Sequence, residues 1–299
     1  MAPTLTIRDF TDPGCPYAFS AEPSRWRLRW LYGDAIEWRP RMVVLSETPE
    51  DDAKKDLTPA KLARGLRSLQ QRFGMPIDSR ERPRLQASVA ACRAVVAARL
   101  RAPGREEALL RRLRILTMGG ELLDDPEAIR TAARQAGVDP ADLEGWTREP
   151  EVERTLREDM AAARDPSPAA RALDHKLAGW DGGRRYTCPS YEIERIADGA
   201  RLDVPGFQPA ESYESAIANL VPELERRAAP ESAEEVLAWA GEPLATAEVA
   251  ALRDEIDLSR TREELARVAD EEPVGPDGYW TLRATSRRAP APVSEIPRR

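Results

Sequence analysis

The chain has 299 residues, a net charge of −7 and a pI near 5.2, and this acidic balance disfavours a general nucleic-acid-binding protein. Hydrophobic residues make up 41% and charged residues 32%, which is typical of a globular protein with a sizeable core. We see no apolar run near the roughly 18 residues that span a membrane, no signal peptide, and too few cysteines for a disulfide framework. We therefore expect a cytoplasmic protein with no membrane partner.

The N-terminal region predicts a strand–helix–strand unit. Residues 4–10 alternate in hydrophobicity and predict a strand, and Pro16 opens a helical pattern. Pro23 is expected to kink this helix or to mark an irregular turn. Residues 35–45 predict a second strand, and a right-handed crossover would make the two strands parallel.

Residues 51–172 lose all strand signals and are rich in Ala, Arg, Leu and Glu, which predicts an inserted block of four to five helices. Cys92 falls on the apolar stripe of one of these helices, so we interpret it as a core residue and not as a redox partner. We interpret Trp26, Trp30 and Trp38 as core residues as well.

Strand character returns at 184–196 and 200–207, and the Asp198–Gly199 turn between them is typical of a hairpin. We therefore assign residues 1–50 and 173–228 to one domain, into which the helical domain 51–172 is inserted.

Residues 229–285 predict a separate appendix of three short helices followed by a hairpin, an order that resembles a winged helix. Residues 229–283 carry fourteen acidic and five basic side chains, which a DNA backbone would repel. We therefore expect the appendix to contact a protein partner or a second copy of the chain. The tail, residues 286–299, is rich in Pro and Arg and is expected to be disordered.

Cys15 lies where the first strand ends and the first helix begins. Pro16 fits the first helical position, which makes Cys15 the N-cap, and the unpaired N–H groups of a helix start stabilise a thiolate. The alternative is a vestigial cysteine in a binding scaffold. The single histidine, His175, has no ligand-type neighbours, so we expect neither a metal site nor a histidine-centred triad.

Three stretches carry a family resemblance: DPGCPYAFSAEPSRW (12–26), ACRAVVAARL (91–100) and TCPSYEI (187–193). Together they resemble the DsbA-like thioredoxin-fold proteins, in particular the branch of FrnE-like proteins, 2-hydroxychromene-2-carboxylate isomerases and YjbH-like adaptors. The resemblance implies an α/β thioredoxin-like fold with a large all-helical insertion and a small C-terminal helical appendix. It also implies that Pro189 is the family's cis-proline.

The resemblance also implies a set of site residues. The catalytic residues would be Cys15 and Cys188, and the substrate-binding residues would be Pro16, Tyr17, Ala18, Thr187 and Pro189. The family's oxidoreductases carry a second cysteine where Ala18 stands, so the ordinary CxxC cycle is excluded. In the thioredoxin plan Cys188 would lie beside Cys15 and could act as its partner. The alternative is that Cys188 is only a small apolar residue on a buried loop.

Three functions remain open from the sequence. The preferred one is a thiol–disulfide oxidoreductase with a single active-site cysteine, which acts on protein thiols or disulfides or on a small thiol. It requires no cofactor, although a low-molecular-weight thiol could serve as one. The alternatives are a redox-degenerate, YjbH-like protein-binding adaptor and a glutathione-type isomerase or transferase.

Overall fold

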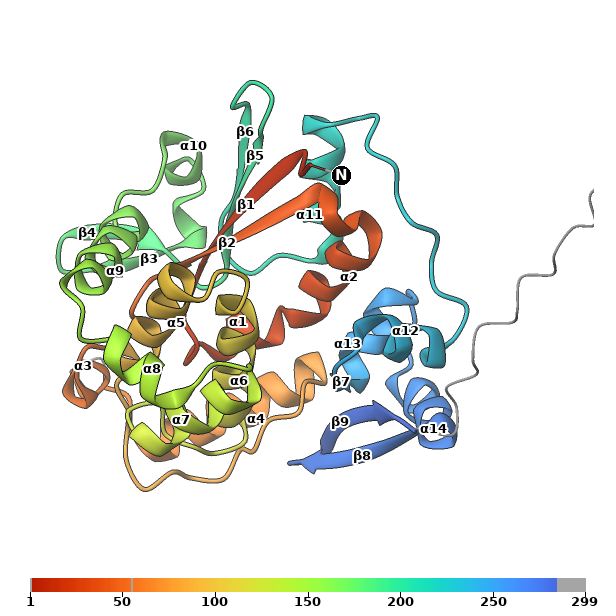
Figure 1. Cartoon of the computed structure of the whole chain (residues 1–299), viewed down its shortest axis with the longest axis horizontal. Coiled ribbons are helices and arrows are strands. Elements are labelled where there is room, and N and C mark those ends of the chain that lie inside the picture. Colours follow the sequence, from red (N-terminus) through yellow and green to blue (C-terminus); the bar gives the residue numbers. More distant parts are fainter. Residues whose placement is uncertain (1, 55, 284–299) are drawn as a thin grey trace, which may run out of the picture.

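The computed structural model describes residues 2–54 and 56–283, and its centre is a four-stranded mixed sheet (Figure 1). The strand order is β2 (Ile36–Met42), β1 (Leu5–Thr11), β5 (Ser190–Arg195) and β6 (Arg201–Val204). Strand β1 runs parallel to β2 and antiparallel to β5, and β5 runs antiparallel to β6. The strands expected at 4–10 and 35–45 are confirmed, as is their parallel pairing.

Two helices pack against the sheet in one shared core. They are α2 (Glu22–Tyr32) and α11 (Ala210–Leu220). Leu5, Ile7 and Ile193 point from β1 and β5 into this core and are fully buried. Burying such side chains supplies most of the driving force for the fold, so this layer fixes where the ends of β1 and β5 meet.

The helix expected from Pro16 onwards is two helices. The first, α1 (Pro16–Ser20), is capped by Ala21, and α2 begins with Glu22 and has Pro23 in its first turn. A proline is accommodated there because the N–H groups of a first turn have no intrahelical acceptor. The interruption expected at Pro23 therefore lies just before it.

The single strand expected over 184–196 is also two strands. Strand β4 (Gly183–Tyr186) pairs with β3 (Leu177–Trp180) in a separate hairpin, whereas β5 pairs with β1. The sequence does not reveal this division, because hydrophobicity alternates along both strands although the two strands pair with different partners. The β5–β6 hairpin around Asp198–Gly199 is confirmed.

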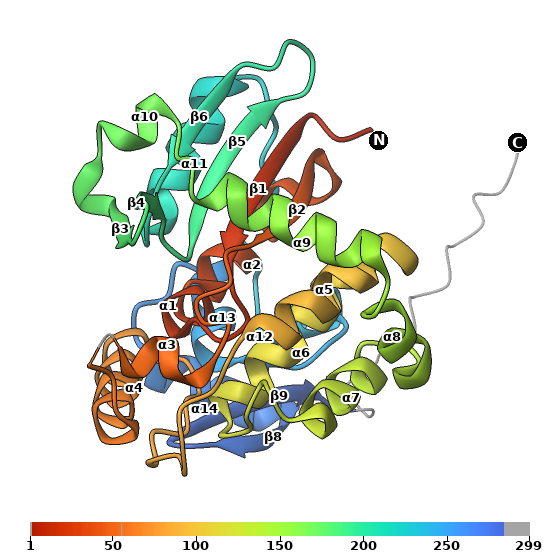
Figure 2. The same ribbon diagram turned by 90° about the vertical axis from the view of Figure 1, so that its left-hand side faces the viewer.

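The helical insertion contains more helices than the four to five expected. The helices are α3 (Pro49–Ala53), α4 (Pro59–Phe73), α5 (Val89–Arg101), α6 (Glu106–Met118), α7 (Pro126–Gln135), α8 (Pro140–Trp146), α9 (Pro150–Ala163) and α10 (Pro168–Arg171). Helix α5 is the core of the block, with Cys92, Val95 and Val96 fully buried, and α9 runs across β2 (Figure 2). Across residues 2–54 and 56–283, no helix is both long and apolar enough to cross a membrane.

The C-terminal appendix has the element order of a winged helix. Its elements are α12 (Ala233–Ala240), β7 (Leu244–Ala245), α13 (Thr246–Leu252), α14 (Leu258–Val268), β8 (Ala269–Val274) and β9 (Asp277–Leu282), and its strands form one sheet in the order β7-β9-β8. The appendix packs on α2 through Trp26 and Trp30, so both tryptophans are core residues as expected. Trp38, on β2, is buried in the core that the sheet forms with α2 and α11. The tail expected to be disordered, 286–299, lies outside the described residues.

The β8–β9 hairpin of the appendix lies directly on the helical insertion. Its turn residue Gly275 has a φ of +61°, and a Cβ at this position would stand 2.4 Å from the carbonyl oxygen of Ile77. Only glycine combines this backbone conformation with so close an approach. The hairpin is therefore held against the loop that follows α4.

Replacing Gly275 tests this contact. Gly275→Ala should lower the free energy of unfolding by about 3 kcal/mol, since it adds a steric clash to left-handed backbone strain. The matched control is Gly241→Ala, because Gly241 has a φ of +66° and open space around its Cα. It should cost only about 1 kcal/mol. Chemical denaturation followed by tryptophan fluorescence measures both, and equal costs would contradict the contact.

Candidate active site

Cys15 lies at the junction of β1 and α1, as expected. It is the N-cap residue of α1, Pro16 occupies the first turn, and only 5% of Cys15 is exposed. The Cys15 side chain accepts no capping hydrogen bond, but the nearby backbone N–H groups of Tyr17 and Ala18 help to lower the pKa of its thiol. A helix start therefore presents its unpaired donors to this thiol.

The structure brings Cys188 into contact with Cys15, although 173 positions separate them. The Cys15 thiol donates a hydrogen bond to the carbonyl oxygen of Cys188 at 3.4 Å, and the two side chains also contact each other. The pairing of Phe10 with Ser190 in the β1–β5 ladder produces this contact, because it sets the residues just before β5 beside the end of β1. The peptide bond between Cys188 and Pro189 is cis, and all three cysteines are free thiols.

The two thiols of the pair differ in acidity. The pKa of Cys15 is lowered chiefly by the hydrogen bond from the Cys188 thiol, with smaller help from the N–H groups of the helix start, while burial and Asp12 oppose this. The pKa of Cys188 is raised well above its usual value by burial and by the neighbouring Cys15 sulfur. Cys15 is therefore the more acidic thiol of the pair.

Asp12 organises the loop that carries Cys15. Its fully buried carboxylate accepts hydrogen bonds from the N–H groups of Gly14 (2.7 Å) and Leu45 (2.8 Å) and from the hydroxyl of Ser88 (2.6 Å). Cys92 donates a weaker bond to it at 3.5 Å. Asp12 thus ties the Cys15 turn to the segment after β2 and to the start of α5. Sequence reasoning missed this role because the partners are far apart along the chain.

The remaining predicted site residues divide into two groups. Tyr17 is 49% exposed beside Cys15, and Pro16 is partly exposed, so both can meet a substrate. Ala18 and Pro189 are buried, and Thr187 donates a hydrogen bond to the carbonyl oxygen of Lys176 at 3.1 Å. Their predicted substrate-binding role stays a prediction.

Two aromatic residues extend the surface beside Tyr17. The ring of Phe207, from the loop before α11, lies edge-on to Tyr17 with 6.4 Å between centroids. Phe73, the last residue of α4, contacts Phe207 at 4.7 Å. Neither was a sequence-based candidate, because nothing in their local sequence relates them to Cys15.

A cavity of about 350 Å³ shares Leu45 with the apolar cluster that contains the thiol pair, although neither cysteine lines it. It is lined by Leu45, which packs against the cluster that contains both thiols, and by Trp180 of the β3–β4 hairpin. Arg164 and Arg185 also line it, and within the described part of the chain neither forms an ion pair with a carboxylate. Arg164 instead stacks on Trp180 at 4.9 Å. The acidic side chains of Glu47, Asp51 and Asp181 line the same cavity, so it carries charges of both signs.

Cys92 and His175 are the candidates for which the sequence predicts no redox or metal-binding role. Cys92 is fully buried in the core of the insertion, and its pKa is raised well above the usual value by burial and by Asp12. His175 is exposed. Among residues 2–54 and 56–283, no group of three His, Cys, Asp or Glu side chains could hold a metal ion.

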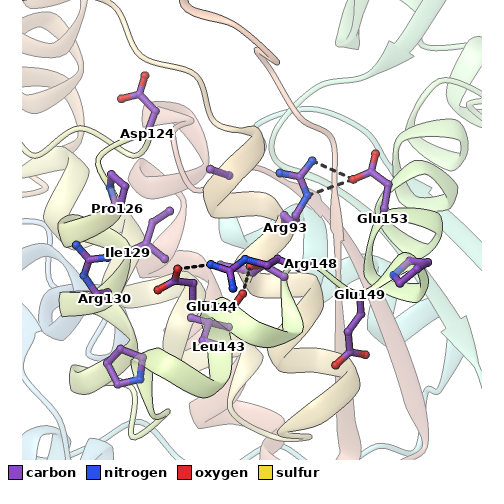
Figure 3. A pocket seen from close by; sticks show the side chains of 15 residues that line it. Arg93, Asp124, Pro126, Ile129, Arg130, Leu143, Glu144, Arg148, Glu149 and Glu153 are labelled. Atoms are coloured by element: carbon purple, nitrogen blue, oxygen red, sulfur yellow. Dashed lines mark hydrogen bonds and ion pairs between the residues drawn. The ribbon is translucent and has the colours of Figure 1, made fainter.

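A larger cavity of about 590 Å³ lies inside the helical insertion, among α5, α7, α8 and α9 (Figure 3). Its floor is apolar and contains Ile129 and Leu143. The charged side chains at its rim are paired, as Arg93 is with Glu153 at 2.9 Å. It contains no cysteine, so it is not the thiol site.

Comparisons with known proteins support the fold seen here. Residues 6–167 match the family model of the DSBA-like thioredoxin domain. No curated protein matches the chain.

Two solved structures share the fold. A candidate protein disulfide isomerase of Nitrosomonas europaea has a TM-score of 0.55 at 15% identity, over 74% of this chain and 98% of the other. A probable DsbA oxidoreductase of Streptomyces coelicolor has a TM-score of 0.51 at 20% identity, over 73% and 91%. At these identities the likeness shows a common fold, and it confirms the thioredoxin-like class expected from the sequence.

The acidity of Cys15 can be tested through its partner. Cys188→Ala removes the thiol that donates to Cys15, so the pKa of Cys15 should rise and its alkylation by iodoacetamide should need a higher pH. Mass spectrometry of the Cys15 peptide across a pH series measures the midpoint. The control Cys92→Ser keeps a donor to Asp12 and should leave the midpoint in place. An unchanged midpoint in Cys188→Ala would show that Cys188 does not stabilise the thiolate.

Proposed function

Because the chain belongs to the DsbA-like thioredoxin family, we propose that it is a thiol–disulfide exchange protein in which Cys15 attacks and Cys188 resolves. The observation that carries the proposal is the contact between Cys15, whose thiol has a lowered pKa and donates to the carbonyl oxygen of Cys188 at 3.4 Å, and Cys188, whose thiol has a raised pKa. The pair replaces the CxxC motif, whose second position is the buried Ala18.

The first step uses the Cys15 thiolate as nucleophile. It attacks one sulfur of a substrate disulfide, a Cys15–substrate disulfide forms, and the other substrate sulfur leaves as a thiolate that takes a proton from water. Tyr17 and the adjoining Phe207 provide an exposed aromatic surface for the substrate beside the reacting sulfur.

The second step uses Cys188. While Cys15 is a thiolate, its charge and its hydrogen bond hold the proton on Cys188. Both effects disappear once Cys15 is bound in the mixed disulfide, so the pKa of Cys188 falls and its thiolate can attack the Cys15 sulfur. A Cys15–Cys188 disulfide forms, and the substrate leaves as a thiol carrying the Cys188 proton. The substrate disulfide is reduced by two electrons and the protein is oxidised by two.

The finer placement within the family is part of the proposal. The motif Asp-Pro-Gly-Cys-Pro at 12–16 resembles the FrnE-like branch, and three free, buried cysteines suit a reducing cytoplasm. We therefore propose a cytoplasmic site of action, with a protein disulfide or a small disulfide as substrate.

Three cysteine variants test the exchange cycle. Cys15→Ser should lower the rate of disulfide exchange by about 1,000-fold or more, because a hydroxyl does not replace a thiolate nucleophile. Cys188→Ala should accumulate the mixed disulfide, seen by mass spectrometry as the mass of the substrate thiol on Cys15. The control Cys92→Ser should keep both rates.

Unchanged exchange in Cys15→Ser would overturn the proposal. If the protein also bound a client equally well with and without the Cys15 thiol, it would be an adaptor and not an enzyme.

The cavity next to the thiol cluster favours a second candidate, in which the reacting partner is a small anionic thiol or disulfide such as glutathione. Arg164 and Arg185 lack carboxylate partners within the described ranges and line this cavity together with Trp180 and with the acidic side chains of Glu47, Asp51 and Asp181. A guanidinium pairs well with the carboxylates of such a ligand. In this form of the proposal a low-molecular-weight thiol serves as cofactor for exchange, isomerisation or transfer.

A charged and an uncharged disulfide substrate test whether the reacting partner is anionic. Arg164→Gln and Arg185→Gln should each lower the rate of reaction with oxidised glutathione by about tenfold, through loss of one charge-assisted contact. The rate with the uncharged hydroxyethyl disulfide should not change. Arg184→Gln is the control, since Arg184 is already paired with Asp174 at 2.7 Å and lies outside the cavity. Equal losses with both disulfides would contradict an anionic partner.

A further inference from the structure

Helix α4, which borders the Cys15 site, carries charge of only one sign. Phe19 of α1 packs with Leu66 and Leu69 of α4 in one buried cluster, so α4 lies directly beside α1. The charged residues of α4 are one lysine and three arginines: Lys61, Arg64, Arg67 and Arg72. In a chain with a net charge of −7, this helix sets positive charge next to the candidate active site.

Three of these four cations have no carboxylate partner. Lys61 pairs with Asp56, whereas Arg64, Arg67 and Arg72 are exposed and form no ion pair within residues 2–54 and 56–283. Most other arginines in these ranges do pair with a carboxylate. The charge on the exposed side of α4 is therefore left for an acidic ligand to neutralise.

Arg72 joins this charge to the aromatic surface beside the thiols. Its guanidinium lies 5.0 Å from the ring centroid of Phe73. Phe73 contacts Phe207 at 4.7 Å, and Phe207 lies edge-on to Tyr17, whose side chain is half-exposed. Because Tyr17 is two residues from Cys15, a polypeptide bound along these rings would extend from the reacting sulfur to Arg72.

A second unpaired cation lies beside Phe207. Lys176 ends the short turn η2 (Asp174–Lys176), and its carbonyl oxygen accepts a hydrogen bond from Thr187. A Cβ at Gly206 would lie 3.5 Å from Cδ of Lys176, so the lysine side chain runs along the residue that precedes Phe207. Its ammonium group forms no hydrogen bond or ion pair within the described part of the chain.

The acidic side chains around these two cations are not paired with them. Asp174 is bonded to Arg184 at 2.7 Å, and Asp257 caps the start of α14. Glu211 is exposed in the first turn of α11 and forms no ion pair with either cation. With Arg72 and Lys176 on its two sides, the aromatic surface carries a net positive charge.

The extent of the charge favours a polypeptide over a small anion. Arg64 and Arg72 are eight residues apart on α4, about 12 Å along the helix axis. One small anion cannot span that distance and also reach Lys176, whereas an extended chain with several carboxylates can.

We propose that this surface binds an acidic polypeptide segment, with an apolar side chain of the segment on Tyr17 and Phe207 and its carboxylates at Arg72 and Lys176. The inference rests on the proposed exchange function and names its substrate class, a protein whose reacting disulfide lies in an acidic, partly apolar stretch. The aromatic rings supply contact area, and the cations steer the encounter and select the charge of the partner.

Fluorescence anisotropy of labelled peptides with the full chain tests the surface without any thiol chemistry. Three short peptides share a Leu-Ser-Leu centre and carry only Glu, only Ser or only Lys at the flanking positions. We expect the Glu peptide to bind at least about tenfold more tightly than the Lys peptide, and its affinity to fall as salt is added. Equal affinity for the two peptides, or no saturable binding of the Glu peptide, overturns the proposal.

Single variants locate the bound peptide. Arg72→Gln and Lys176→Gln should each weaken binding of the Glu peptide by about threefold, because each removes one exposed charge-assisted contact. The matched control is Arg154→Gln, which removes an equally exposed and unpaired arginine from α9 and should leave the affinity unchanged. Equal losses in Arg154→Gln and Arg72→Gln would show a mere effect of net charge and overturn the proposal.

Charge reversal separates recognition from a folding defect. The double variant Arg72→Glu/Lys176→Glu should prefer the Lys peptide to the Glu peptide, a change that misfolding does not produce. A retained preference for the Glu peptide would place the acidic ligand elsewhere and overturn the proposal.

Disulfide-linked dimers of the same peptides, with Cys in place of the central Ser, separate this inference from the exchange cycle. Faster exchange with the Glu dimer than with the Lys dimer supports the substrate class. Equal exchange with the two dimers would overturn the substrate class and leave the cycle intact. Preferential binding of the Glu peptide without exchange of any dimer would overturn the cycle and support the binding surface.

Discussion

The candidate site depends on the buried carboxylate of Asp12. Three short hydrogen bonds, from Gly14, Leu45 and Ser88, join the turn before α1 to the segment after β2 and to the helical insertion. A buried carboxylate is stable only when it is well paired, so these segments must assemble together. Cys15, one residue past Gly14, is therefore positioned jointly by the sheet and by the insertion. The negative charge of Asp12 also acts against the lowering of the pKa of Cys15.

The two thiols differ in acidity because their backbone surroundings differ. Both cysteines are buried, but only Cys15 faces the free N–H groups of a helix start. Cys188 precedes a strand and has no such donors, so burial keeps it protonated. In the proposed exchange cycle, this difference in acidity makes Cys15 the attacking thiol and Cys188 the resolving one.

Buried ion pairs fasten the appendix to the rest of the molecule. Arg111 of α6 pairs with Glu248 of α13 at 2.7 Å and with Glu242 at 3.0 Å, and it lies 3.5 Å from Glu22 of α2. Breaking one partner of such a network would leave an uncompensated buried charge, so the three elements are held in one arrangement. Arg111 also lies over the ring of Trp26, 5.1 Å from its centroid. The appendix and the α2 helix therefore form one packed unit.

Local sequence patterns determined much of this protein: the strand before Cys15, the Pro16 helix start, the helical character of 51–172 and the burial of Cys92 on an apolar stripe. These follow from periodicity and from the chemistry of helix starts, which act over a few residues. The pairing of β1 with β5, the separate β3–β4 hairpin and the Asp12 contacts were decided only by tertiary structure. Without the resemblance, no local pattern relates Cys188 to Cys15, because the choice of a strand's partner depends on the whole fold and not on its own sequence.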